Sequence, residues 1–103
     1  MKNLDLYTNN ELHFIVNGEN VKIKKLDINE IKDIYNKEFQ NNKDTEIENI
    51  AFLLAHRNAI HNYDKNVAFV TLQSAGGMPI SFEGWNEKGD FVNNYVVYSD
   101  SRI

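Results

Sequence analysis

The stretch Thr45–Tyr63, TEIENIAFLLAHRNAIHNY, constrains the fold more than any other part of this 103-residue chain. Its apolar residues fall on nearly every side of a helix rather than along one stripe. A helix of that kind is normally buried between other elements. The spacing of Thr45 and Glu48 fits a capping box, which predicts that the helix begins there. We therefore expect a central helix with the rest of the chain packed around it.

The segment before this helix has the pattern of a hairpin. Apolar residues alternate with polar ones along Leu12–Lys25 on both sides of Asn17-Gly18, a dipeptide that favours a tight hairpin because both residues tolerate positive φ. Residues 1–11 are expected to form a short edge strand or an arm. The second half of the hairpin carries three basic residues, Lys22, Lys24 and Lys25. In one interpretation they protect an exposed sheet edge from pairing with another chain; in the other they contact phosphates.

The segments on either side of the central stretch complete the expected fold. Asp27 starts an amphipathic helix that runs to about Gln40. Residues 67–73, VAFVTLQ, are apolar on both sides, which predicts an interior strand covered on both faces. Residues 80–85 and 91–98 predict a second hairpin. This order predicts a single α+β domain over 1–103, with a mainly antiparallel sheet of about five strands packed on the central helix.

Composition narrows the function classes. The chain has no cysteine, which excludes disulfides, thiolate metal sites and cysteine nucleophiles. Its net charge of −4 argues against general nucleic-acid binding, which needs a basic face. The start, MKNLDLYTNNEL, has no apolar run of a signal peptide, and no segment reaches membrane-spanning length. We therefore expect a cytoplasmic protein that does not enter a membrane.

The apolar side of the central helix continues into polar residues in its last two turns. These residues are Arg57, Asn58, His61 and Asn62. In one interpretation the helix emerges into solvent, and His61 satisfies terminal carbonyls. In the other, Arg57 and His61 lie one turn apart and clamp an anion, a phosphate or a nucleotide. The second interpretation makes the four residues a ligand site, either within one chain or at a homo-oligomer interface.

Catalytic and metal sites have weaker signals. His56 and His61 lie five residues apart, whereas two histidines that share a metal on a helix favour a spacing of four, so we expect no metal site and no cofactor. A ribonuclease-like set for acid–base cleavage can be drawn from His56, Arg57, His61 and Glu83. The acidic balance of the chain counts against it.

The C-terminal strands carry aromatic residues with polar handles, chiefly Trp85, Tyr95 and Tyr98. They form a partner-binding patch, complete the core, or stack on a base with Arg57 on its phosphate. Our first hypothesis is a small non-catalytic protein that binds a protein partner, such as a regulator, an inhibitor or an immunity-type protein from a phage or mobile element. A small-ligand-binding or sequestering oligomer is the alternative, and a ribonuclease-like enzyme is the weaker one.

Overall fold

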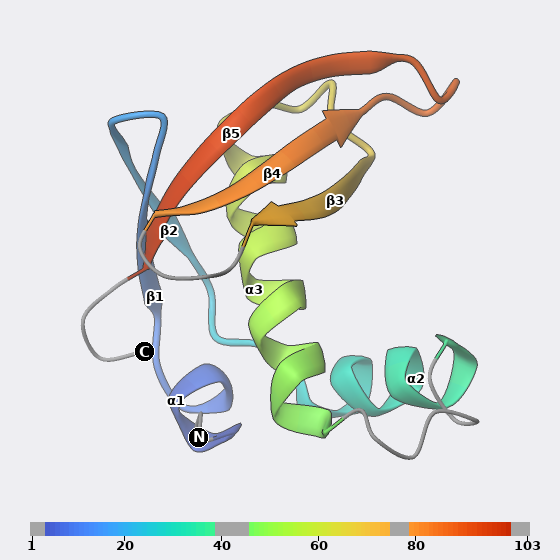
Figure 1. Cartoon of the computed structure of the whole chain (residues 1–103). Helices are drawn as coiled ribbons and strands as arrows, with labels where there is room; N and C mark the ends of the chain where they lie inside the picture. Colours follow the sequence, from blue (N-terminus) through green and yellow to red (C-terminus); the bar gives the residue numbers. More distant parts are fainter. Residues whose placement is uncertain (1–3, 39–45, 75–78, 100–103) are drawn as a thin grey trace.

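The computed structural model describes residues 4–38, 46–74 and 79–99. The described part has three helices and a five-stranded sheet (Figure 1): α1 Leu4–Thr8, β1 Leu12–Val16, β2 Glu19–Ile23, α2 Ile28–Glu38, α3 Ile47–Tyr63, β3 Phe69–Ser74, β4 Ile80–Trp85 and β5 Phe91–Ser99. The strand order is β2-β1-β5-β4-β3, and every neighbouring pair is antiparallel. The α+β class and the five-stranded antiparallel sheet are confirmed.

The helix α3 is central, as expected. Figure 1 shows it running beneath the sheet, with α1 and α2 near its N-terminal end. Its buried positions lie around much of its circumference: Ile50, Ala51, Leu54, Ala55, His56, Ala59 and Ile60. The predicted capping residue Thr45 lies outside the described residues. Glu46 is the N-cap instead, and its side chain makes no capping hydrogen bond.

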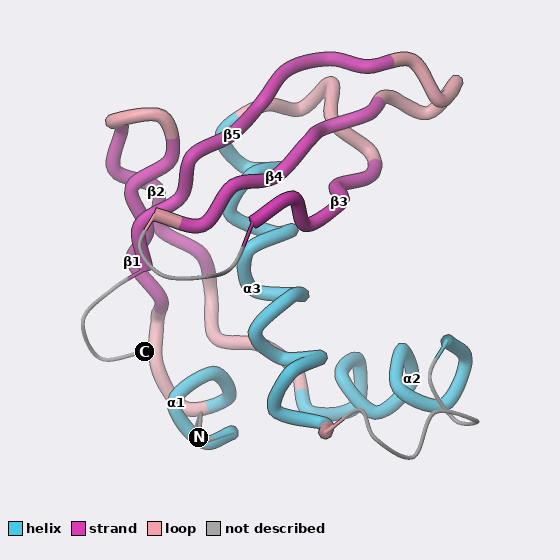
Figure 2. Tube along the Cα trace, viewed as in Figure 1, coloured by secondary structure: helices cyan, strands magenta, loops and turns pink. Residues whose placement is uncertain are grey.

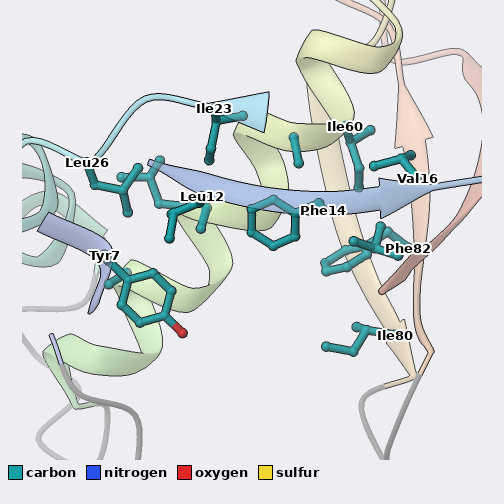
Figure 3. Packing of buried hydrophobic residues seen from close by; sticks show 14 of the residues in the cluster. Tyr7, Leu12, Phe14, Val16, Ile23, Leu26, Ile60, Ile80 and Phe82 are labelled. Carbon is teal, nitrogen blue, oxygen red and sulfur yellow. The ribbon is translucent and has the colours of Figure 1, made fainter. Parts of the chain in front are cut away.

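The sheet has an inner face toward α3 and an outer face on the opposite side. Strict alternation along β4 buries Ile80, Phe82 and Gly84 and leaves the residues between them on the outer face. On β1, Phe14 and Val16 are likewise buried. Figure 3 shows side chains of β1, β2, β4 and α3 pointing into this shared core. The described structure is therefore two layers, with the core between the sheet and the helices.

Two local predictions near the N-terminus have different outcomes. The tight hairpin is confirmed, because Asn17 and Gly18 both have positive φ, 49° and 86°. The prediction of an edge strand or arm for residues 1–11 is wrong where the structure describes them. Leu4–Thr8 is a helix that buries Tyr7, and the Tyr7 carbonyl accepts a hydrogen bond of 2.7 Å from the Leu26 amide. The helical turn gives a large aromatic ring access to the core, which a solvent-facing arm does not.

The prediction of an interior strand at 67–73 is also wrong. The strand β3 begins at Phe69 and is the last strand of the sheet, paired only with β4 among the described elements. Every residue of β3 except the half-buried Val70 is exposed. Among the strands, the backbone of α3 lies closest to β1 and β2, and its His56 and Tyr63 rings reach Phe82 on β4 and Tyr95 on β5. Most of β3 therefore lies beyond the edge of the helical layer. The apolar residues on both sides of β3 are therefore mostly exposed to solvent in the described structure.

Candidate binding surfaces

The polar end of α3 contributes to a pocket. Asn58, His61 and Asn62 line a cavity of about 390 Å³ together with Lys24 and Lys25 from the segment after β2. Two acidic residues of the α2 start, Asp27 and Glu30, also line it. Three of the four residues predicted for a ligand site are therefore brought together. Arg57 is half-buried and does not line this pocket.

Two of these pocket residues already hold backbone groups. The His61 Nδ1–H donates to the Val67 carbonyl at 2.9 Å, which ties the end of α3 to the chain leading into β3. The Asn62 Nδ2 donates to the Lys22 carbonyl over a long 3.5 Å. The carbonyl that His61 satisfies lies beyond the helix rather than in its last turn. The polar end of α3 thus has a structural role in addition to lining the pocket.

His56, by contrast, is a core residue. It is fully buried among the rings of Phe14, Phe52 and Phe82, with ring centroids 4.2–5.5 Å away. Its Nδ1–H donates to the Phe52 carbonyl at 2.7 Å, because a carbonyl only accepts. The only sequence signal for this burial was its place on a helix apolar nearly all round.

The ribonuclease-like set does not converge. The buried His56 ring lies under the inner face, against Phe82. Glu83 follows Phe82 on β4 and therefore points to the outer face. The sheet separates the two side chains, so they cannot act on one substrate atom. In the described residues there is also no group of three His, Cys, Asp or Glu side chains that could hold a metal.

Tyr95 is not part of a partner surface, and this prediction is corrected. Its side chain is fully buried on the inner face, opposite Phe82. Its hydroxyl donates to the Asp64 Oδ2 at 2.8 Å. Burial, reinforced by this carboxylate, raises the pKa of the Tyr95 hydroxyl above its ordinary value. Gly84 leaves the space for the ring, because a Cβ at Gly84 would lie 2.5 Å from the Tyr95 Cε2.

Trp85 belongs to a row of three aromatic residues on the outer face, which we call the aromatic cluster: Phe69, Trp85 and Phe91. Trp85 is the register partner of Phe69 on one side and of Phe91 on the other. Its ring meets Phe91 edge to face, with centroids 5.5 Å apart, and its Nε1–H donates to the Thr71 hydroxyl at 3.3 Å. Phe69 and Phe91 are 57% and 49% exposed. The cluster is thus held in place on one side and open on the other.

Tyr98 lies at the far end of the same face. It is the register partner of Ile15 on β1, and both side chains are exposed, as is that of Val96 on the same strand. Tyr98 lies seven positions after Phe91 on β5, which at the rise of an extended strand is roughly 20 Å. The predicted partner residues Trp85, Tyr95 and Tyr98 therefore occupy three different places: the aromatic cluster, the core and the far end of the outer face.

The β3 edge is the feature that sequence reasoning missed. Residues 69–74 contain no charged side chain. Leu72 pairs with the buried Phe82 and so lies on the inner face, yet it is 46% exposed. Both faces of β3 and its outer edge are therefore open in the described structure. The signal was present in the apolar residues on both sides of the strand, which the sequence alone assigned to burial.

The chain matches none of the protein-family models, curated proteins or solved structures with which it was compared. No helix among the described residues is long and apolar enough to cross a membrane.

Proposed function

We propose that the protein acts by binding a protein partner through the aromatic cluster. The observation that carries this proposal is the exposure of Phe69 and Phe91 around a positioned Trp85. A phenylalanine exposed by half leaves on the order of 100 Å² of apolar surface in water. Burial of both rings supplies about 5 kcal/mol before the costs of association. Tryptophan is enriched among the residues that carry most of the binding energy at protein interfaces, and phenylalanine is enriched at interfaces as well.

The charges around the cluster favour a protein over a nucleic acid. The strands β3, β4 and β5 contain no lysine or arginine. Single-stranded nucleic acids bind to aromatic residues that lie in a positively charged groove. A base stacked on Trp85 would find no cation on these strands for its phosphate. The neighbouring pocket at the β4–β5 turn is lined by Lys65 and Lys88 but also by Glu87 and Asp90, so it adds no net positive charge.

The test compares two matched variants on one face. Tagged wild-type protein, Phe91→Ser and Tyr98→Ser are used to capture proteins from an extract of the cells that carry the gene. We expect a protein that is captured by wild type and by Tyr98→Ser and is lost with Phe91→Ser. Circular dichroism and thermal melting show that the variants are folded. Capture that Tyr98→Ser abolishes and Phe91→Ser leaves intact would contradict the proposed surface.

A second candidate function is binding of a small anion in the pocket at the end of α3. The observation that favours it is the presence of Lys24 and Lys25 beside Asn58 and His61 in one cavity. Titration with inorganic phosphate and with adenosine monophosphate, followed by amide NMR shifts, tests it. We expect Lys25→Gln to reduce the response and Lys32→Gln, an exposed lysine outside the pocket, to leave it unchanged. Equal responses in both variants would remove this candidate.

A further inference from the structure

The edge of β3 offers backbone hydrogen-bonding groups beside the aromatic cluster. Alternate residues of an antiparallel strand direct their N–H and C=O groups away from the paired neighbour. On β3 these groups face outward along residues 69–72, before the register of its pairing with β4 shifts between Leu72 and Ser74, and the strand contains neither charge nor proline. Edge strands of that kind are templates for pairing with another chain. Figure 2 shows β3 with β4 on one side and no described strand on the other.

We propose that the partner adds an extended segment to β3 as a sixth strand, and that this segment carries a basic residue between apolar ones. The inference rests on the proposed function, because it specifies how the partner binds. It requires no change in the sheet, since the added strand continues the existing pairing beyond β3. Peptides bound in this way gain affinity from main-chain hydrogen bonds and specificity from alternate side chains.

The basic residue follows from the charge of the outer face. Glu83 is the only charged residue in β3, β4 and β5, and it forms no ion pair with another described residue. It is the register partner of Thr71, whose side chain is small. A residue of the added strand opposite Thr71 lies on the same face, about 10 Å from β4. The long side chain of arginine or lysine crosses Thr71 and reaches the Glu83 carboxylate.

The apolar residues follow from the two faces of β3. Residues of the added strand on either side of the basic one point to the inner face, beside the exposed Leu72 and the half-buried Val70. Aliphatic side chains there would extend the core beyond the reach of α3. The residue opposite Phe69 lies on the outer face, where an aromatic ring would lengthen the aromatic cluster. The partner pattern is therefore aliphatic, basic, aliphatic, aromatic.

The charges of the sheet also disfavour a second copy of this chain as the occupant. A two-fold pairing of β3 with its copy joins two surfaces whose strands hold no cation. Both Glu83 carboxylates then stay unpaired, and each chain brings a net charge of −4. A basic segment neutralises Glu83, whereas a second copy does not.

The probe is the blocked peptide Ser-Thr-Val-Arg-Val-Tyr-Ser, which places arginine opposite Thr71 in an antiparallel pairing with β3. Full-length protein is titrated with it to millimolar concentration, and amide shifts are followed by NMR. We expect shifts along β3 with none along β2. Absence of shifts on β3 overturns the proposal. Concentration-dependent dimerisation through β3, measured by sedimentation without peptide, overturns the choice of occupant.

Two further variants separate strand addition from non-specific apolar contact. Glu83→Gln should weaken peptide binding about two- to fivefold, the range of an exposed ion pair. Glu83→Lys should prefer a peptide in which arginine is replaced by glutamate. Unchanged affinity in both variants would contradict the presence of a basic residue in the partner segment.

Two N-methylated peptides test the backbone pairing. One is methylated at the valine amides and the other at the threonine, arginine and tyrosine amides. Because only alternate amides of an added strand face β3, we expect one peptide to lose binding and the other to keep it. Equal effects of the two modifications would contradict strand addition.

These outcomes are independent of the test of the proposed function. If Phe91→Ser loses partner capture and the peptide causes no NMR shifts on β3, the protein-binding function stands and strand addition is ruled out. If the peptide binds at β3 but Phe91→Ser does not affect partner capture, strand addition stands. The partner surface then lies elsewhere than the aromatic cluster.

Discussion

The two edge strands of this sheet are built in opposite ways. The strand β2 carries Lys22 at an exposed position and is followed by Lys24 and Lys25. Its inner side packs on α3, and the Asn62 amide donates to its Lys22 carbonyl. The strand β3 has no charged residue, and α3 packs mainly against strands at the other side of the sheet.

The difference shows which edge the sequence protects against pairing. Lysines, β-bulges and coverage by a helix are devices that keep an edge from joining other chains. The edge strand β2 carries Lys22, packs on α3 and has one carbonyl capped by Asn62, and Lys24 and Lys25 follow it. In the described structure β3 has neither a lysine nor a covering helix, and its pairing shifts register only near its end, between Leu72 and Ser74. An open edge of this kind can pair with other chains and aggregate when the protein is alone. The same edge can serve as a binding site where a partner covers it.

The largest expected effect tests this contrast through two inner-face aliphatic residues. Ile23 on β2 is 4% exposed, and Leu72 on β3 is 46% exposed. We expect Ile23→Ala to lower the free energy of unfolding by about 2–4 kcal/mol, because it leaves a cavity against α3. Leu72→Ala should cost less than ~1 kcal/mol, because water already reaches the side chain. Urea denaturation of both variants measures the difference, and equal costs would show that β3 is covered in solution.

A second prediction concerns the close packing of Gly84 against Tyr95 and Val67 on the inner face. Gly84→Ala places a Cβ 2.5 Å from the Tyr95 ring and 3.1 Å from Val67 Cγ2. The ring must shift, and we expect a loss of about 1–3 kcal/mol in the free energy of unfolding. The glycine at 18 has no neighbour within 4 Å of its added Cβ but needs positive φ, so Gly18→Asn is the matched control that stays nearly neutral. A neutral Gly84→Ala would show that the ring has room to move.

The sequence predicted those parts of the fold whose signals are local. Asn17-Gly18 specifies its turn because few residue pairs tolerate positive φ twice. The stretch around Leu54 predicted a central helix because its apolar residues surround the axis. The misassigned elements depend on distant parts of the chain. The sequence of residues 67–73 does not show that α3 lies mainly under β1 and β2. The same apolar pattern is therefore compatible with an interior strand and with an open edge strand.

The candidate sites show the same division. The residues at the end of α3 were found because helical spacing places Asn58, His61 and Asn62 on one side, and the structure brings them to one pocket. Tyr95 was misplaced because an aromatic strand residue reads the same on either face. The face of the sheet on which Tyr95 lies is set by its register with Phe82 and by the space that Gly84 leaves for the ring. Neither can be predicted from the sequence of β5 alone.

The third prediction compares two buried tyrosines. The Tyr95 hydroxyl donates to Asp64, whereas the buried Tyr7 hydroxyl finds no hydrogen-bond partner among the described residues. We expect Tyr95→Phe to cost about 1 kcal/mol and Tyr7→Phe to be neutral or stabilising. Thermal or urea denaturation at neutral pH measures both. A costly Tyr7→Phe would mean that its hydroxyl has a partner outside the described residues.

The same tyrosines set the response to alkaline pH. Burial raises the pKa of both Tyr7 and Tyr95 above the ordinary value of 10.0. The folded protein therefore keeps phenolic protons that the unfolded chain loses, so the free energy of unfolding is unaffected below about pH 10 and falls as the pH rises above it. Each Phe variant should make this fall shallower. A stability that stays flat above pH 10 would contradict the burial of these hydroxyls.

The smallest expected effect concerns the capped carbonyl of β2. Asn62 is exposed, and its bond to the Lys22 carbonyl is long at 3.5 Å, so Asn62→Ala should lower the free energy of unfolding by less than ~0.5 kcal/mol. The sharper measurement is hydrogen exchange, because the cap holds one end of β2 against α3. We expect faster exchange of the β2 amides and unchanged exchange along β3. If Asn62→Ala leaves β2 exchange unchanged and instead weakens phosphate binding, Asn62 serves the pocket rather than the edge, and the protection of β2 rests on its lysines and on α3.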